Sequence, residues 1–124
     1  MRKNTVLFSF VFLLSLLVIG CKSQPVTPVV EEGPTTEEVV QKLYVEYKAG
    51  QIERCTYQGE TIYKCSRNAP DGGSEIFDAS GDKMGGCYYN TGALHAACEG
   101  STDCNVIYRV AKNIWGKPGV ELIK

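Results

Sequence analysis

Cysteine spacing is the feature that most constrains what this chain can fold into. Of its six cysteines, five lie in the C-terminal part of the sequence: Cys55, Cys65, Cys87, Cys98 and Cys104. A domain of about ninety residues has a thin hydrophobic core, whose burial barely offsets the conformational entropy lost on folding. We therefore expect disulfide bridges to supply part of its stability, provided that the chain enters an oxidising compartment.

The N-terminal segment indicates that the chain is exported. Arg2 and Lys3 precede an apolar run from Val6 to Ile19. A membrane-spanning helix needs roughly twenty apolar residues, whereas a run of about fourteen is typical of a signal peptide. Retention of this run as an anchor helix is the alternative. We interpret residues 1–20 as a signal peptide.

A short motif, Val18-Ile19-Gly20-Cys21, ends this segment. It resembles the lipobox of bacterial lipoproteins, in which two branched apolar residues and a small residue precede a cysteine. The resemblance implies that Cys21 receives a lipid and becomes the mature N-terminus, so that acyl chains anchor the protein to a membrane of the cell envelope. If the host is Gram-negative, Lys22 in the place of an inner-membrane retention Asp implies the outer membrane.

The residues that follow predict a tether and then one small domain. Residues 21–34 contain three prolines and no aromatic residue. Proline-rich linkers favour extended conformations of about 3.1 Å per residue. We therefore expect 21–34 to be a flexible tether and 35–124 to form the folded domain.

The mature chain would be mildly acidic. All fourteen acidic residues follow Cys21, whereas two of the thirteen basic residues, Arg2 and Lys3, lie in the predicted signal peptide. Removal of the signal peptide leaves eleven basic and fourteen acidic residues, a net charge of −3. The remaining chain has no basic cluster of the kind that neutralises phosphate groups, so we expect no binding to nucleic acid.

The domain opens with a helix signature. Thr35 and Glu38 match a capping box, and Gly50 is a C-terminal stop signal. Apolar residues recur at helical spacing between these signals: Val39, Val40, Leu43, Tyr44 and Tyr47. We expect one amphipathic helix of about three turns. Its apolar stripe is predicted to cover a sheet, and a partner-binding face is the alternative.

The period changes after Gly50 to that of strands, which predicts two hairpins and a further strand. The expected strands are Ile52 to Tyr57, Thr61 to Cys65, Glu75 to Asp78, Lys83 to Tyr89 and Val106 to Ala111. Residues 90–102 are expected to be a loop with at most one helical turn, and a helix over 106–115 is the alternative to the last strand. This order predicts an α+β domain in which one helix packs on a small, disulfide-linked antiparallel meander.

With the lipidated cysteine set aside, the other five form at most two bridges and leave one thiol. Short loops favour two pairs: Cys98 with Cys104, and Cys55 with Cys65, which flank the first hairpin. A symmetric hairpin loop would set the latter two opposite each other, whereas a tighter turn would set them on a diagonal. These pairings leave Cys87 unbonded. Alternatively, Cys87 bonds Cys65 and Cys55 is left over.

Four residues have the ligand types of a zinc site, namely Cys87, His95, Cys98 and Cys104. They are separated by seven, two and five residues, a spacing that matches no zinc module. An oxidising compartment also favours bridges over thiolate ligands. A metal-active or redox-active envelope protein that uses these residues is therefore the alternative reading, and we predict no metal or cofactor.

Other candidate chemistry is weak. Four acidic residues lie in or beside turns and are assigned to turn stabilisation rather than to paired catalytic carboxylates or a calcium loop: Asp71, Glu75, Asp78 and Asp82.

Tyr88 and Tyr89 are adjacent in an expected strand and point to opposite faces of it, so at least one of them is expected to leave the core face. Exposed tyrosines are enriched at recognition sites.

With one histidine and no recognisable acid–base pair, the chain is predicted not to be an enzyme, and no catalytic residue is assigned. We expect an exported, lipid-anchored envelope protein with a small binding or structural domain, whose ligand is unknown and whose partner would be another envelope protein.

Overall fold

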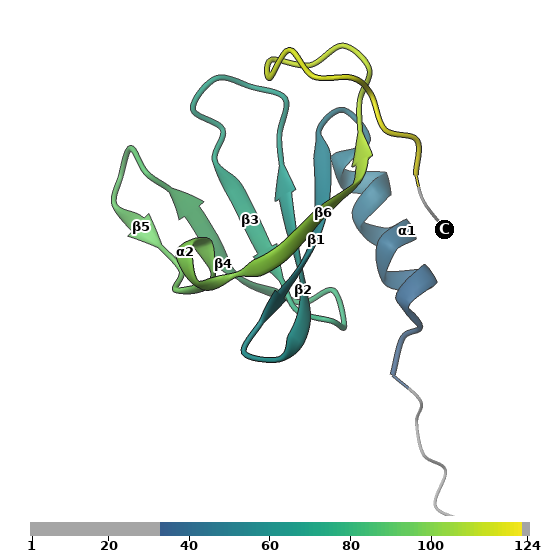
Figure 1. Cartoon of the computed structure of the whole chain (residues 1–124), viewed down its shortest axis with the longest axis vertical. Helices are drawn as coiled ribbons and strands as arrows, with labels where there is room; N and C mark the ends of the chain where they lie inside the picture. Colours follow the sequence, from purple (N-terminus) through teal and green to yellow (C-terminus); the bar gives the residue numbers. More distant parts are fainter. Residues whose placement is uncertain (1–32, 123–124) are drawn as a thin grey trace, which may run out of the picture. The chain divides into compact units, whose positions relative to one another are not determined.

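The structure is a computed structural model that describes residues 33–122 (Figure 1). The predicted signal peptide, Cys21 and most of the predicted tether lie outside these residues. Within them the chain forms two helices and one six-stranded antiparallel sheet, with two disulfides, so the predicted α+β class with disulfide bonds is confirmed. None of the described helices is long and apolar enough to cross a bilayer.

The elements follow one another in a simple order along the chain. They are α1 (Thr36–Tyr47), β1 (Gln51–Tyr57), β2 (Glu60–Ser66), β3 (Ser74–Phe77), β4 (Lys83–Tyr88), β5 (Ala93–Leu94), α2 (Ala97–Gly100) and β6 (Thr102–Arg109). The strand order in the sheet is β5-β4-β3-β2-β1-β6. The first five strands are a meander, and β6 returns to pair with the other edge of β1.

Helix α1 begins at the capping box that Thr35 and Glu38 form. The Thr35 hydroxyl accepts a bond from the Glu38 backbone N–H at 3.3 Å, and the Glu38 carboxylate accepts one from the Thr35 N–H at 2.8 Å. Together they satisfy two of the backbone donors that a helix start leaves unpaired. The bonds that the Thr35 N–H and hydroxyl donate to the carboxylate lower the pKa of Glu38. The helix buries its apolar face on the sheet in a first core: Val39, Val40, Leu43, Tyr47, Ile52, Tyr63, Cys65, Phe77 and Ile107.

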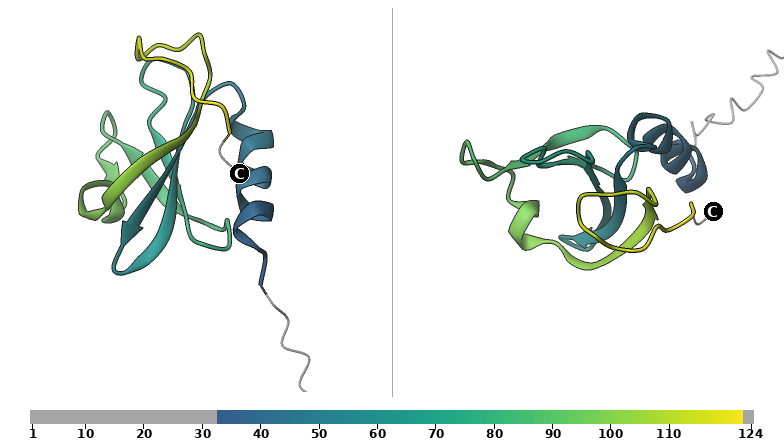
Figure 2. Two further views of the ribbon diagram at one scale, coloured as in Figure 1. Left: turned by 45° about the vertical axis from the view of Figure 1, so that its right-hand side comes forward. Right: turned by 90° about the horizontal axis from the view of Figure 1, so that it is seen from above.

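A second core lies on the other face of the sheet, where α2 packs (Figure 2). It consists of Cys55, Ile62, Ile76, Cys87, Ala97 and Cys98. The sequence predicts one helix on one face of the sheet, with at most one further helical turn within 90–102, so this second core is not expected from it. Helix α2 has a single turn, which local sequence signals do not distinguish from a loop, and its packing depends on a disulfide to β4.

The turn of the first hairpin sets the register of the two central strands. Gln58 and Gly59 have backbone φ angles of 50° and 79°, as a two-residue hairpin turn with positive φ requires. Cys55 therefore lies opposite Ile62, and Cys65 lies opposite Ile52. Because side chains alternate between faces, Cys55 faces the second core and Cys65 faces the first.

Two predicted boundaries in the last third of the chain are corrected. The strand expected from Val106 to Ala111 is β6, which spans Thr102–Arg109, and the helix alternative for 106–115 is wrong. All four residues from Thr102 to Asn105 are exposed and three of them are polar, so their sequence lacks a strand pattern. They become a strand because β1 offers this segment hydrogen-bonding partners. The loop expected over 90–102, with at most one helical turn, contains a single helical turn, α2, and also the two-residue strand β5, which was not expected.

Candidate functional site

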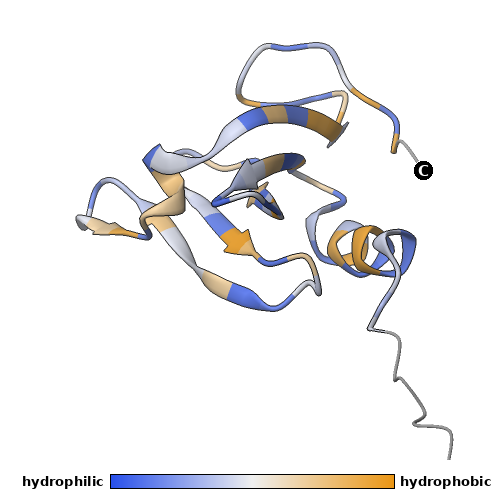
Figure 3. Ribbon diagram, turned by 60° about the horizontal axis from the view of Figure 1, so that its bottom comes forward, coloured by the Kyte–Doolittle hydropathy of each residue, from blue (hydrophilic) through white to orange (hydrophobic). Residues whose placement is uncertain are grey.

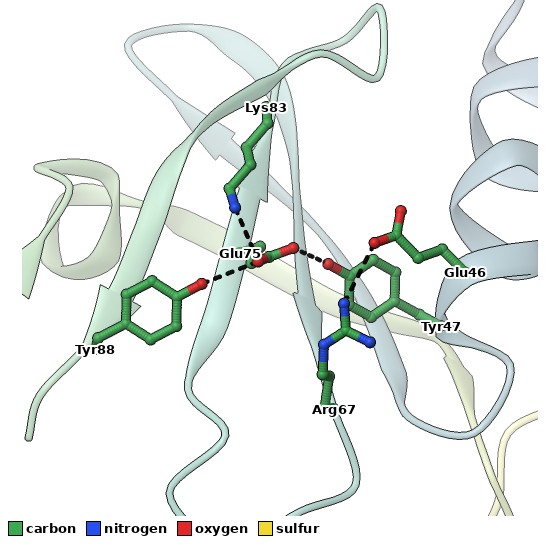
Figure 4. A network of polar contacts seen from close by, with 6 residues as sticks. All are labelled: Glu46, Tyr47, Arg67, Glu75, Lys83 and Tyr88. Carbon is green, nitrogen blue, oxygen red and sulfur yellow. Dashed lines mark hydrogen bonds and ion pairs between the residues drawn. The ribbon is translucent and has the colours of Figure 1, made fainter.

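A polar network centred on Glu75 joins α1 to strands β3 and β4 (Figure 4). We call Glu75, Tyr47, Lys83 and Tyr88 the Glu75 network. Glu75 Oε1 accepts a bond from Lys83 Nζ at 2.8 Å and one from the Tyr88 hydroxyl at 3.0 Å. Its Oε2 accepts a bond from the Tyr47 hydroxyl. The Glu75 side chain is 19% exposed and that of Lys83 is 52% exposed, so the network lies at the rim of the first core.

Two glycines position the ring of Tyr88. A Cβ on Gly86 would lie 2.2 Å from Tyr88 Cε2, and a Cβ on Gly73 would lie 2.7 Å from Tyr88 Cδ1. The ring therefore lies directly on the backbone of both glycines, which brings its hydroxyl to Glu75. On the other face His95 packs over Gly85, where a Cβ would lie 3.1 Å from the His95 Cβ. A glycine weakens a strand, but here the absence of a Cβ leaves room for an aromatic ring on each face of the sheet.

The surroundings of Glu75 keep its carboxylate charged. Burial alone would raise the pKa of Glu75, but the bonds from Lys83, Tyr47 and Tyr88 outweigh it and lower the pKa from 4.5 to about 2. Burial, and then the bond to Glu75, raise the pKa of Tyr47 well above 10 and raise that of Tyr88. The bond to Glu75 also raises the pKa of Lys83.

These protonation states define what the Glu75 network can do. A general base works best with a pKa near the operating pH, and a carboxylate with a pKa of about 2 takes up protons poorly at neutral pH. Both oxygens of Glu75 already accept bonds from side chains. The carboxylate therefore acts as a fixed negative charge that holds α1 against β3 and β4.

A shallow pocket of about 250 Å³ lies beside the network, at the C-terminal end of α1. The Arg67 guanidinium lies over the Tyr47 ring, 5.2 Å from its centroid, and approaches Glu46 at 3.4 Å. Both side chains of this ion pair are about half exposed, and solvent screens such pairs strongly. The pocket wall is lined by Glu46, Tyr47, Ala49, Gly50, Arg67, Asn68 and Ala69.

The structure changes the assignment of one acidic residue and keeps another in a turn. Asp78 Oδ1 accepts backbone bonds from Ser80 and Asp82, both at 2.9 Å, as an acidic turn residue does. Glu75 was grouped with the turn residues, but it lies inside β3 at the centre of the network. The alternation of side chains along the strand could have indicated this role. Glu75 lies on the same face of β3 as the buried Phe77, and a charged side chain on an apolar face needs polar partners.

The disulfide pairing differs from the expected one. Two bridges form, as the cysteine count allowed, but they join Cys55 to Cys104 and Cys87 to Cys98. The expected pairs Cys98–Cys104 and Cys55–Cys65 are wrong, because β6 pairs with β1 and the first hairpin places its two cysteines on opposite faces. Among the described cysteines the unbonded one is Cys65, not Cys87 or Cys55.

The four residues considered as a zinc site are used differently. Cys87 and Cys98 are bonded to each other, and Cys104 is bonded to Cys55. His95 Nδ1 accepts a bond from the Ala97 N–H at 3.1 Å. In the part of the chain that the structure describes, no three His, Cys, Asp or Glu residues are grouped closely enough to hold a metal ion.

Cys65 should be inert in the folded protein. Burial, and then the nearby acidic residues, raise the pKa of its thiol far above 9.0, so almost no thiolate is present at neutral pH. We expect iodoacetamide to label no thiol of the described domain at pH 7.5 under native conditions, and one thiol, that of Cys65, after unfolding without reductant. Mass spectrometry of the labelled chain checks this prediction. Fast labelling of the folded protein, or labelling of three thiols after unfolding, would contradict it.

The turn between β4 and β5 presents the domain's most exposed aromatic side chain. All six residues from Tyr89 to Leu94 are exposed. Tyr89 is 67% exposed and Leu94 41%, whereas Tyr88 belongs to the Glu75 network. The two adjacent tyrosines thus have separate roles, and the expectation that at least one leaves the core face is confirmed.

Fold and network together define a small, disulfide-bonded α+β domain. Comparisons of the chain with protein-family models, with curated proteins and with solved structures gave no match.

Proposed function

We propose that this chain is an exported, lipid-anchored protein of the cell envelope, and that its domain is a non-catalytic binding module. The observation that carries the proposal is the pairing of four domain cysteines into two bridges. Structural disulfides persist in oxidising compartments, which agrees with the export signal at the N-terminus. The lipobox-like motif supports anchoring through Cys21, and the outer membrane is the expected location in a Gram-negative host.

Binding agrees better than catalysis with the described side chains. The Glu75 carboxylate is held in its charged form and bonded through both oxygens, and the Cys65 thiol is buried. By contrast, Tyr89 and Leu94 are exposed on a short hairpin. Exposed tyrosines are frequent among the side chains that dominate protein interfaces. We therefore expect a protein of the envelope as the partner, and no nucleic acid, because the mature chain is acidic.

Replacing the predicted lipid acceptor tests the anchor. We expect Cys21→Ser to move the protein from the membrane pellet to the soluble fraction, because stable anchoring requires acyl chains buried in the bilayer. Incorporation of labelled palmitate should be lost in parallel. Fractionation of cells that produce the full-length chain measures both effects.

Cys65→Ala is the matched control, because it removes another cysteine and leaves the predicted acceptor. It should remain in the pellet and take up palmitate as the wild-type chain does. If Cys21→Ser stays in the pellet, another segment holds the protein to the membrane and the lipid-anchor proposal fails.

A further inference from the structure

The β4–β5 hairpin is closed at its base by a covalent bond. Cys87 lies at the end of β4 and is bonded to Cys98 in α2, eleven positions further along the chain. We call the segment between these two cysteines the Cys87–Cys98 loop. Its exposed part, Tyr89 to Leu94, lies beyond the second core, while both bonded cysteines are buried in that core.

Hydrogen bonds fix the shape of this loop in the free protein. The Thr91 N–H and hydroxyl both donate to the Tyr88 carbonyl, at 3.2 and 3.1 Å, and the Ala93 N–H donates to the Thr91 hydroxyl at 3.4 Å. The His95 N–H donates to the Gly86 carbonyl at 2.9 Å. A loop that is already ordered loses little conformational entropy on binding, which favours affinity.

The chemistry of the loop is unusual for this chain. No Asp, Glu, Lys or Arg occurs between Lys83 and Glu99, although such residues make up 22% of the sequence. Two of the few exposed large hydrophobic side chains lie here, on Tyr89 and Leu94. Strand β5 is an edge of the sheet, and its apolar residues lie on the outside of the molecule in Figure 3.

We propose that the Cys87–Cys98 loop is the surface through which the domain binds its partner, and that it enters an uncharged, apolar cleft of another protein. Tyr89 and Leu94 would be the anchoring side chains. This inference rests on the proposed binding function and names its surface. An uncharged loop requires an uncharged cleft, because a charge buried opposite it would have no partner.

The same observations favour a protein cleft over a lipid surface. Peripheral membrane contacts combine a broad apolar face with Lys or Arg residues that attract anionic headgroups. The loop exposes two large apolar side chains and contains no Lys or Arg. A hydrogen-bonded loop with an exposed tyrosine is instead suited to a protein site, where a few residues supply most of the binding energy.

Site-specific crosslinking in cells tests the proposal with the full-length chain. A photoreactive benzoylphenylalanine is placed at position 89, or at position 45 as the control, because Val45 on α1 is 72% exposed and lies on another surface. We expect a discrete protein adduct from position 89 and none from position 45. A second change, Leu94→Ser, should lower the yield of this adduct roughly tenfold, as loss of an interface anchor does.

Each result has a separate meaning. A lipid adduct at position 89, or an adduct with a second copy of this chain, would overturn the proposed partner. A protein adduct at position 45 but not at 89 would overturn the loop as the binding surface and leave the binding function standing. Absence of a protein adduct at both positions would overturn the loop proposal and count against the binding function as well. Formation of both disulfides, checked by mass spectrometry, confirms that each variant is folded.

Discussion

Replacing Cys55 and Cys104 together by Ala should lower the free energy of unfolding by about 4 kcal/mol. The bridge links residues 49 positions apart, and the entropy that it removes from the unfolded chain grows with the length of the closed loop. The bridge between Cys87 and Cys98 closes only 11 positions, so its removal should cost about 3 kcal/mol. Urea unfolding followed by circular dichroism measures both values. Such losses are a large fraction of the stability of a domain of this size.

The linked peptides, and not the ranking of the two variants, distinguish the observed pairing from the expected one. Under the Cys98–Cys104 and Cys55–Cys65 pairing, replacing Cys55 and Cys104 together would break both bridges, so that this variant would again be the less stable one. Cys65→Ala is the control variant, because it removes a cysteine and leaves both bridges intact. A non-reduced digest should contain peptides linked through Cys55 and Cys104. A peptide linking Cys98 to Cys104 would contradict the structure.

Glu75→Gln should destabilise the domain by about 2 kcal/mol at neutral pH. The charged form of Glu75 is stabilised by three donors, which lower its pKa from 4.5 to about 2. A shift of this size corresponds to at most about 3 kcal/mol, and the exposure of Lys83 to solvent reduces the contribution. For a domain of this size the melting temperature should fall by roughly 10 °C. Thermal unfolding at pH 7 measures the effect.

The pH dependence of the same variant supplies an independent check. Because the pKa of Glu75 is lower in the folded chain than in the unfolded chain, its contribution is complete above about pH 5. The contribution is lost as the pH falls from 4.5 towards 2, where the carboxylate becomes protonated. The difference in stability between wild type and Glu75→Gln should therefore be constant near neutral pH and shrink in acid.

Matched variants separate the donors of the network. Tyr47→Phe and Tyr88→Phe each remove one hydroxyl bonded to Glu75 and keep the ring. Each should reduce the acid-dependent loss of stability only in part, whereas Glu75→Gln should abolish the part that is due to Glu75. Glu121→Gln changes an exposed carboxylate outside the network and should leave the pH profile unchanged. An unaltered acid profile in Glu75→Gln would show that the carboxylate is not held as the structure places it.

Local signals accounted for much of the fold. The capping box of Thr35 and Glu38 coincides with the start of α1, and the strand periods coincide with β1 to β4 within one or two residues. These elements could be predicted from the sequence because each depends on residues a few positions away in the chain. Helix α2 and the first half of β6 could not be predicted in this way, because a single helical turn and a largely polar strand show no hydrophobic periodicity.

Patterns in the amino-acid sequence are sufficient to predict the α+β class, the two hairpins and an odd cysteine in the domain, and they also predict the export signal and the lipid anchor. The tertiary structure decided which cysteines pair, because β6 returns to β1 and brings Cys104 beside Cys55 across 49 positions. It also decided that Glu75 joins α1, β3 and β4 instead of stabilising a turn. The physical reason is that both outcomes depend on contacts between distant segments, whereas sequence patterns report the preferences of neighbouring residues.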